Sequence, residues 1–313
     1  MKTQNVGNTE WQASSVILGN MRMDKLSVDE AAEVIETAYH NGINFFDSAD
    51  IYGKGQSEII FGQALKQSSV NREDIFIQSK AGIVPPTAEN REQKRYDFSR
   101  EHLLNSVDGI LERMQIDYLD SFLLHRPDPL MDVAEVASVF DELEKSGKVK
   151  HFGVSNFNTE QFKLLQNNVS QKLIINQLQF SIMHSGMIDV GLHANMTDSQ
   201  SVDHDGSILT FSQNEGTTIQ AWSPFQYGTF DGVFIDNEKF PKLNETLEKL
   251  SLKYGVTKNA VAAAWILRHP ANFQVILGTM NPKRIADSAA GADIVLDRQE
   301  WYDIYLAAGN QLP

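Results

Sequence analysis

The amino-acid sequence predicts a single domain over residues 1–313 with the fold of a (β/α)8 TIM barrel, in which helices surround a closed parallel sheet. Short apolar runs alternate with amphipathic helical segments, which is the order that a parallel sheet requires. No linker or change of composition interrupts this alternation. Polar residues follow successive strands, where barrels carry their functional groups. An open doubly wound sheet is the alternative, but no helix follows a complete G-x-G-x-x-G pattern.

The expected strands are short apolar runs, as is typical of strands that are buried on both faces. The run from Ile43 to Phe46 is an example, because it is apolar and stops at the charged residue Asp47. The run that ends at Leu124 is soon followed by Pro127 and Pro129, which cannot continue a strand or a helix. The expected strands cover residues 15–19, 43–46, 74–80, 118–124, 149–154, 173–177, 218–222 and 273–277.

The helices between these strands have apolar residues at helical spacing and recognisable ends. Ser27 and Glu30 form a capping box at the start of the first helix, and Gly42 ends it. Ser57 is expected to cap the second helix and Thr159 a later one. The expected helices pass through residues 31–39, 58–65, 99–114, 133–143, 207–213, 242–254, 257–269 and 301–308, two more begin at residues 159 and 283, and residues 81–98 form a long loop.

The composition excludes several classes of protein. Hydrophobic residues make up 42% and charged residues 22% of the chain, as in a protein with a sizeable core. The absence of cysteine excludes disulfides and thiolate chemistry and fits a reducing compartment, so we expect a cytoplasmic protein. The net charge of −14 argues against nucleic acid as a partner. No signal peptide or membrane-spanning run is expected, and the sequence does not indicate an oligomeric state.

Four residues that could form a reaction centre follow three successive strands: Asp47 and Tyr52, then Lys80, then His125. An ammonium beside a phenol stabilises the phenolate and lowers the pKa of the phenol, while a carboxylate keeps the ammonium charged. A histidine beside the phenol can position a carbonyl oxygen or relay a proton. Each residue alone is more often structural, but four of them at neighbouring strand ends indicate a catalytic site.

The motifs around these residues resemble the aldo-keto reductase family of (α/β)8 barrels, and most closely its bacterial YdhF-type oxidoreductases. This resemblance covers nearly the whole chain. It implies NADPH-dependent reduction of an aldehyde or ketone, with Tyr52 as general acid and His125 as the group that orients a small carbonyl substrate. Lys80 and Asp47 are implied to be the pair that adjusts the pKa of Tyr52. The motifs are Asp-Ser-Ala-Asp-Ile-Tyr-Gly at 47–53, Ser-Lys at 79–80, Leu-His-Arg-Pro at 124–127, Gly-Val-Ser-Asn-Phe at 153–157, Asn-Gln at 176–177, Trp-Ser-Pro-Phe at 222–225 and Gly-Thr-Met-Asn-Pro-Lys-Arg at 278–284.

The resemblance also implies a binding site for NADPH or NADP+. Ser155, Asn156 and Gln177 match the groups that hold the nicotinamide carboxamide, and Trp222 matches the ring that stacks on the nicotinamide. The start of the last barrel helix matches the site of the 2′-phosphate, where backbone N–H groups, the helix dipole and an arginine favour an anion. The implied cofactor contacts are Gly19, Asn20, Met21, Asp47, Ser155, Asn156, Gln177, Trp222, Ser223, Phe225, Gly278, Thr279, Asn281, Arg284, Asp287 and Ser288.

Two other functions are compatible with parts of the sequence. A barrel of this family could sense a bound cofactor with little turnover, and the four catalytic-type residues do not exclude this. A metal-dependent hydrolase is suggested by the histidines and aspartates of the insertion at 181–214, but these residues lack a compact metal-binding spacing, and we expect a solvated loop and no metal. The residues concerned are His184, Asp189, His193, Asp203, His204 and Asp205.

Overall fold

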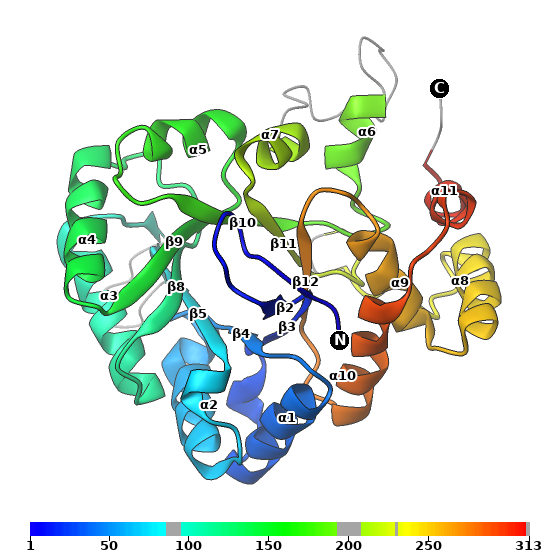
Figure 1. The fold of residues 1–313 in the computed structure, drawn as a ribbon, viewed down its shortest axis with the longest axis horizontal. Helices are drawn as coiled ribbons and strands as arrows, with labels where there is room; N and C mark the ends of the chain where they lie inside the picture. The colour runs from blue at the N-terminus through cyan, green and yellow to red at the C-terminus, as the bar shows by residue number, and fades with distance from the viewer. Residues whose placement is uncertain (86–94, 193–207, 229–230, 311–313) are drawn as a thin grey trace.

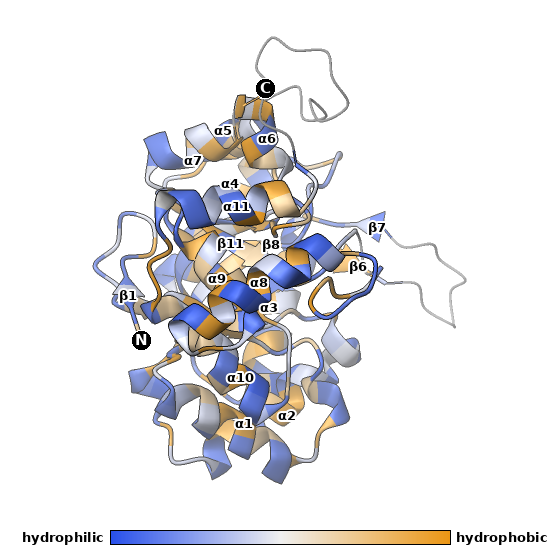
Figure 2. Ribbon diagram, turned by 90° about the vertical axis from the view of Figure 1, so that its right-hand side faces the viewer, coloured by the Kyte–Doolittle hydropathy of each residue, from blue (hydrophilic) through white to orange (hydrophobic). Residues whose placement is uncertain are grey.

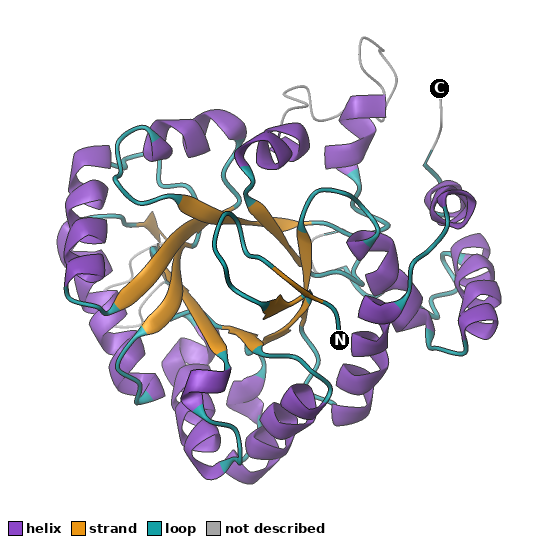
Figure 3. Cartoon of the chain, in the orientation of Figure 1, coloured by secondary structure: helices purple, strands orange, loops and turns teal. Residues whose placement is uncertain are grey.

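The computed structural model describes residues 1–85, 95–192, 208–228 and 231–310. Its centre is a closed barrel of parallel strands in the order β10-β11-β12-β3-β4-β5-β8-β9, with helices outside (Figure 3). The predicted (β/α)8 barrel is therefore confirmed. The barrel strands are β3 (Val16–Gly19), β4 (Phe45–Asp47), β5 (Phe76–Ala81), β8 (Leu119–Leu124), β9 (Val149–Ser155), β10 (Leu173–Gln179), β11 (Thr218–Trp222) and β12 (Phe273–Leu277).

Helices follow the barrel strands and form a ring around them (Figure 1). Colouring by hydropathy shows apolar strands at the centre and helices with both apolar and polar residues (Figure 2). None of the helices in the described ranges is both long and apolar enough to cross a membrane. The helices are α1 (Val28–His40), α2 (Gln56–Gln67), α3 (Arg100–Met114), α4 (Val133–Lys145), α5 (Thr159–Gln166), α6 (Gly186–Leu192), α7 (Ile208–Glu215), α8 (Pro241–Tyr254), α9 (Lys258–Leu267), α10 (Pro282–Ala289) and α11 (Arg298–Ala307), with 3-10 turns η1 (Met23–Lys25), η2 (Tyr52–Gly55), η3 (Arg72–Asp74) and η4 (Ala290–Asp293).

The N-terminal hairpin covers the end of the barrel where the strands begin. It consists of β1 (Thr3–Gln4) and β2 (Ala13–Ser14), which pair antiparallel and lie across the barrel mouth in Figure 1. Trp11 of this hairpin stacks on Phe76 at the start of β5, with 4.7 Å between the ring centroids. Because aromatic packing closes this mouth, a ligand has to enter from the carboxyl ends of the strands.

Several predicted helix ends were wrong by one or a few residues. Ser57 does not cap α2, because its hydroxyl donates to the Met21 carbonyl at 3.3 Å and the residue before the helix is Gly55 in a left-handed conformation. Asn158, and not Thr159, caps α5 in a capping box with Gln161. The segment 81–98, expected to be a loop, also contains a short hairpin of β6 (Ile83–Val84) and β7 (Arg95–Tyr96).

Candidate active site

The four predicted catalytic residues lie together at the carboxyl ends of three adjacent barrel strands. Asp47 is the last residue of β4, Lys80 lies near the end of β5, and His125 directly follows β8. Tyr52 begins the η2 turn that leads from β4 into α2. The strands β4, β5 and β8 pair in parallel and in this order, so their ends meet at the same edge of the barrel.

The turn that carries Tyr52 is fixed by close packing. Gly53 has φ 55°, and a Cβ atom there would lie 2.5 Å from the Asp24 side chain. Gly55 has φ 88° and packs against Arg113, whose Nε donates to the fully buried carboxylate of Glu58 at 2.8 Å. A larger residue at either glycine would need both an unfavourable backbone conformation and displaced neighbours. Packing of η1 and α3 against these two glycines thus fixes the turn that carries Tyr52.

Lys80 joins the carboxylate to the phenol. Its Nζ lies 2.8 Å from Oδ1 and 2.9 Å from Oδ2 of Asp47, and it donates to the Tyr52 hydroxyl at 3.4 Å. The Lys80 side chain is fully buried, and its Nζ also donates to the Ser48 carbonyl. A buried ammonium needs such partners, because an unpaired one would be strongly destabilising.

The ionisation of this group follows from burial and charge. Burial opposes the charge on Lys80, but Asp47 and Tyr52 outweigh it and raise the pKa of the ammonium. Burial raises the pKa of Tyr52, and Lys80 only partly counteracts this effect. The ammonium lowers the pKa of the phenol, as expected, but removal from water outweighs this effect, so the net shift of the pKa is upward. The phenol keeps its proton at neutral pH.

A cavity of about 1250 Å³ opens beside these residues. Tyr52 and His125 both line it, with their rings 6.0 Å apart and nearly perpendicular. Lys80 lies behind Tyr52 and does not line the cavity. Most of the residues predicted to contact a cofactor line it, namely Gly19, Met21, Asp47, Ser155, Asn156, Gln177, Trp222, Ser223, Phe225, Gly278, Thr279, Asn281 and Arg284.

One wall of the cavity is a continuous set of polar groups from the ends of β9, β10 and β11. The Ser155 hydroxyl donates to the Gln177 carbonyl at 3.0 Å and accepts from the Asn156 amide at 2.7 Å. Trp222 donates from Nε1 to the Asn156 side chain at 3.3 Å. The indole, the amides and the hydroxyl therefore form one surface that could bind the flat edge of an amide-bearing ring.

The far end of the cavity lies at the start of α10. Asn281 caps this helix by accepting from the Arg284 backbone N–H at 3.0 Å, and Thr279 accepts from the Asn281 N–H at 3.2 Å. Arg22 reaches across from the segment after β3 and donates to the Gly278 carbonyl at 2.8 Å. A helix N-terminus with arginines beside it favours an anionic group.

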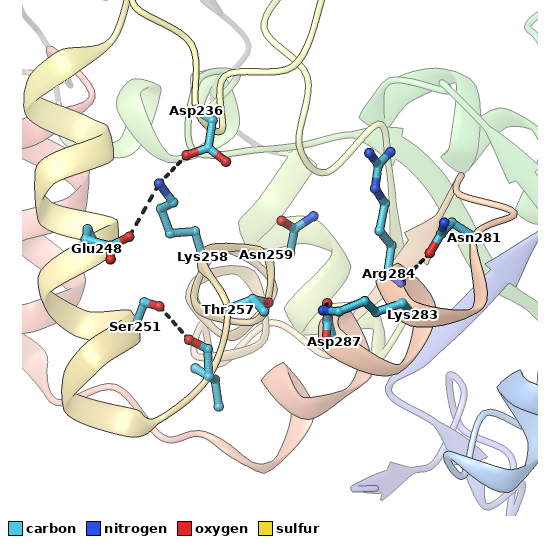
Figure 4. A pocket seen from close by; sticks show the side chains of 11 residues that line it. Asp236, Glu248, Ser251, Thr257, Lys258, Asn259, Asn281, Lys283, Arg284 and Asp287 are labelled. Atoms are coloured by element: carbon cyan, nitrogen blue, oxygen red, sulfur yellow. Dashed lines mark hydrogen bonds and ion pairs between the residues drawn. The ribbon is translucent and has the colours of Figure 1, made fainter.

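A second cavity of about 490 Å³ adjoins this end and shares four residues with the first, Asp236, Asn259, Asn281 and Arg284. Figure 4 shows Lys258 directed toward Asp236 and Glu248, with 3.4 Å between the Lys258 and Glu248 atoms. Asp287 lines this second cavity and pairs with Lys283 at 2.7 Å. The two cavities adjoin and together form a long site. The catalytic-type residues lie at one end, and the other end has both cations and carboxylates, namely Lys258, Lys283, Arg284, Asp236, Glu248 and Asp287.

The structure does not bring every predicted residue to these cavities. Asn20 and Ser288 are fully buried and line neither of them; Ser288 is one of the buried residues of α10, and Asn20 directly follows β3. Several residues that line the cavities were not predicted. For Arg22 and Lys25 the sequence did offer a signal, because these two cations closely follow β3. The missed residues include Arg22, Lys25, Arg126, Asp236 and Asn259.

The histidine and aspartate insertion shows no metal site in the part that can be described. Asp189 of α6 accepts from the Tyr305 hydroxyl at 2.5 Å and from Ser185 at 3.1 Å, so it anchors α6 to α11. The described residues contain no group of three or more potential ligands placed to hold a metal ion. His193, Asp203, His204 and Asp205 lie outside the described residues.

Comparison with known proteins agrees with this geometry. The model of the Aldo/keto reductase family matches residues 15–306. The 6-dehydroglucose reductase of Agrobacterium fabrum is 34% identical over 308 residues, which cover 96% of each chain. Oxidoreductase YdhF of Escherichia coli is 33% identical over 304 residues, covering 96% of this chain and 95% of its own. An aldo/keto reductase from Klebsiella pneumoniae, crystallised with NADP and acetate, is similar in fold with a TM-score of 0.74 at 22% identity, covering 97% of this chain and 94% of its own.

Proposed function

The chain belongs to the aldo/keto reductase family and is an oxidoreductase, and from this premise we propose that it reduces an aldehyde or ketone to an alcohol with NADPH. The observation that carries the proposal is the buried pair of Lys80 and Asp47, which reaches the hydroxyl of Tyr52 at the wall of a large cavity. Lys253, Tyr254 and Glu300 also combine an ammonium, a phenol and a carboxylate, but Lys253 is 55% exposed and these residues line neither cavity.

The residues of the long site fit the proposed cofactor. The first cavity alone, with a volume of about 1250 Å³, exceeds a typical pocket for a drug-sized ligand, as a dinucleotide and a substrate would need. The polar wall of Ser155, Asn156 and Gln177 suits the carboxamide, and Trp222 suits the face of the nicotinamide. Thr279, Asn281 and Arg284 suit the 2′-phosphate at the start of α10. When bound, NADPH supplies the hydride.

Tyr52 gives the proton that the reduced oxygen takes up. Its pKa is raised by burial, so the hydroxyl is protonated over the physiological range and can act as a donor. Lys80 donates to the phenol oxygen, and this contact strengthens as negative charge develops there. His125 lies edge-on to Tyr52 and faces the cavity, where it can orient a carbonyl oxygen toward the phenol. Asp47 keeps the ammonium charged throughout.

The Tyr52→Phe variant tests the proposal. It removes the proton donor and little else, so we expect carbonyl reduction to fall by about 10²- to 10⁴-fold while NADPH affinity stays nearly unchanged. The assay follows the loss of NADPH absorbance with a panel of aldehydes and ketones. The panel includes 6-dehydroglucose, because a relative that is 34% identical bears the name of a reductase of this sugar. Tyr39→Phe, in α1 and remote from the cavity, is the matched control.

Two results would contradict the proposal. Retention of most of the turnover by Tyr52→Phe would show that another group donates the proton. Failure of every carbonyl in the panel to oxidise bound NADPH would favour the alternative function, a barrel that binds the cofactor and senses its state with little turnover.

A further inference from the structure

The interior of this barrel contains glutamines on four different strands. Gln78 of β5, Gln177 of β10, Gln220 of β11 and Gln274 of β12 are each at most 3% exposed. Barrel interiors are usually filled with branched apolar side chains. A buried amide is destabilising unless both its N–H and its carbonyl groups find partners, so four of them require a common explanation.

These glutamines form one hydrogen-bonded chain. The order of donors and acceptors along this chain is fixed at Gln274, which lies at one end of it. The backbone carbonyl of Ser14 can only accept, and it accepts from Gln274 Nε2 at 3.0 Å. Gln274 must therefore present its oxygen to Gln220, whose Nε2 donates to it at 3.0 Å. The Gln220 oxygen is left to accept from Gln78 at 2.7 Å and from Gln177 at 3.2 Å. Each amide orients the next one, because an acceptor can be met only by a donor.

The chain ends at the predicted active site. The Nε2 atoms of Gln78 and Gln177 both donate to Asp47 Oδ1, at 2.6 and 3.1 Å. Ser121 Oγ donates to the Gln78 oxygen at 2.9 Å, so this oxygen also has a partner in the observed orientation. The same Asp47 oxygen lies 2.8 Å from Lys80 Nζ. Three donors thus converge on one carboxylate oxygen, which fixes the position of this oxygen relative to Lys80.

We propose that Gln78, Gln220 and Gln274 are positioning residues that hold the Asp47 carboxylate in one orientation, so that Lys80 stays directed at Tyr52. This inference rests on the proposed function, since it assigns these residues to the reaction of that same site. None of the three touches the cavity, and each acts through Asp47. The side-chain N–H2 group of Gln177 already donates to Asp47 and Gln220. Gln177 therefore offers its side-chain carbonyl oxygen, and not its N–H2 group, to a bound cofactor.

The first test replaces Gln274 with methionine, an apolar residue of similar volume. The change lies three hydrogen bonds away from Asp47, yet it frees Gln220 and then Gln78 to rotate. We expect kcat for carbonyl reduction to fall about 10- to 100-fold, since small misplacements of reacting groups have effects of this size. KM for the carbonyl should change little. Gln171→Met is the matched control, because Gln171 is also buried and hydrogen-bonded, to Asp141 and Glu144, but lies outside the chain.

A second pair of variants tests the direction of the chain. Gln220→Met removes both an acceptor and a donor, and it should be slow at every pH. Gln220→Glu introduces a carboxyl that, while protonated, has a carbonyl to accept from Gln78 and Gln177 and an O–H to donate to Gln274. This variant should approach wild-type kcat at low pH and become slow once the new carboxyl ionises. The titratable groups near Asp47, namely Lys80, Tyr52 and beyond it His125, are the same in both variants.

The outcomes separate this inference from the proposed function. Loss of kcat in Gln274→Met but not in Gln171→Met, with recovery of Gln220→Glu at low pH, supports the positioning role. Should Gln274→Met not fold, Ser121→Ala, which removes only the hydroxyl partner of the Gln78 oxygen, is expected to lower kcat more mildly. If the wild type is active and kcat is unchanged in the variants of Gln274 and Gln220, the inference is overturned and the proposed function stands. A wild type that reduces no carbonyl would overturn both.

Discussion

Replacing Lys80 by methionine tests the energetics of the buried ion pair. The side chains of Lys80 and Asp47 are 0% and 3% exposed, so the variant leaves a carboxylate in the barrel without its cation. Removing one partner of a buried pair costs about 3–5 kcal/mol of folding free energy. The Gln78 and Gln177 donors remain on Asp47, and we therefore expect a loss near 3 kcal/mol, the lower end of that range. Carbonyl reduction should fall as far as in Tyr52→Phe.

Urea unfolding of wild type and variants measures this loss through the midpoint and slope of the transition. Lys148→Met is the matched control, because Lys148 pairs with Asp108 at the surface with side chains that are 41% and 56% exposed. Such a pair contributes about 0–1 kcal/mol. The double variant Lys80→Met with Asp47→Asn should regain most of the stability but none of the activity. The reasoning is refuted if Lys80→Met loses no more stability than Lys148→Met, or if the double variant is as unstable as the single one.

Two further predictions concern the cofactor and pH. Arg284→Ala should weaken NADPH binding by roughly 10- to 100-fold and leave NADH binding unchanged. The control Lys283→Ala should alter neither affinity, because Lys283 is paired with Asp287. Fluorescence quenching of Trp222 reports both affinities, and equal weakening of NADPH and NADH binding would contradict a phosphate-specific role of Arg284. Burial raises the pKa of Asp50 to about 7 from 3.8, so the folded chain binds this proton more tightly than the unfolded chain does. The free energy of unfolding therefore falls as the pH rises from about 4 to 7. Asp50→Asn should therefore be more stable than wild type by roughly 2–4 kcal/mol at pH 8 and by little at pH 4. If the urea midpoints of variant and wild type differed equally at both pH values, Asp50 would not bind a proton on folding.

The catalytic-type residues could be predicted from the sequence because parallel barrels repeat a simple geometry. Asp47, Lys80 and His125 each stand where an apolar run stops, and parallel strand ends meet at one edge whatever the details of packing. Tyr52 was predictable for the same reason, since the short connection from β4 to α2 cannot carry it far. The site therefore depends on positions along strands, which periodicity and turn residues indicate.

Features that depend on tertiary packing could not be predicted in this way. Gln78 and Gln220 are 142 residues apart, so their hydrogen bond has no local signal, and each glutamine alone resembles an ordinary break in an apolar strand. The net direction of the Tyr52 pKa shift depends on how much water the fold removes, which a list of neighbouring charges does not contain. The caps are different. Asn158 and Gln161 show the capping-box spacing in the sequence, and this spacing should have been preferred over Thr159.

The acidic composition and the proposed anionic cofactor are compatible because charge acts locally. The chain carries a net charge of −14, yet at physiological ionic strength charges beyond about 8 Å are largely screened. The cations at the far end of the cavity differ in how far they are already used. Lys258 pairs with Asp236 and Glu248, Lys283 pairs with Asp287, and Arg22 donates to the Gly278 carbonyl. The Arg284 guanidinium has no ion-pair partner within the described ranges, so it can form a charge-assisted contact with a phosphate without breaking an existing one. This difference is why the preference for NADPH over NADH should depend on Arg284 more than on any of its charged neighbours.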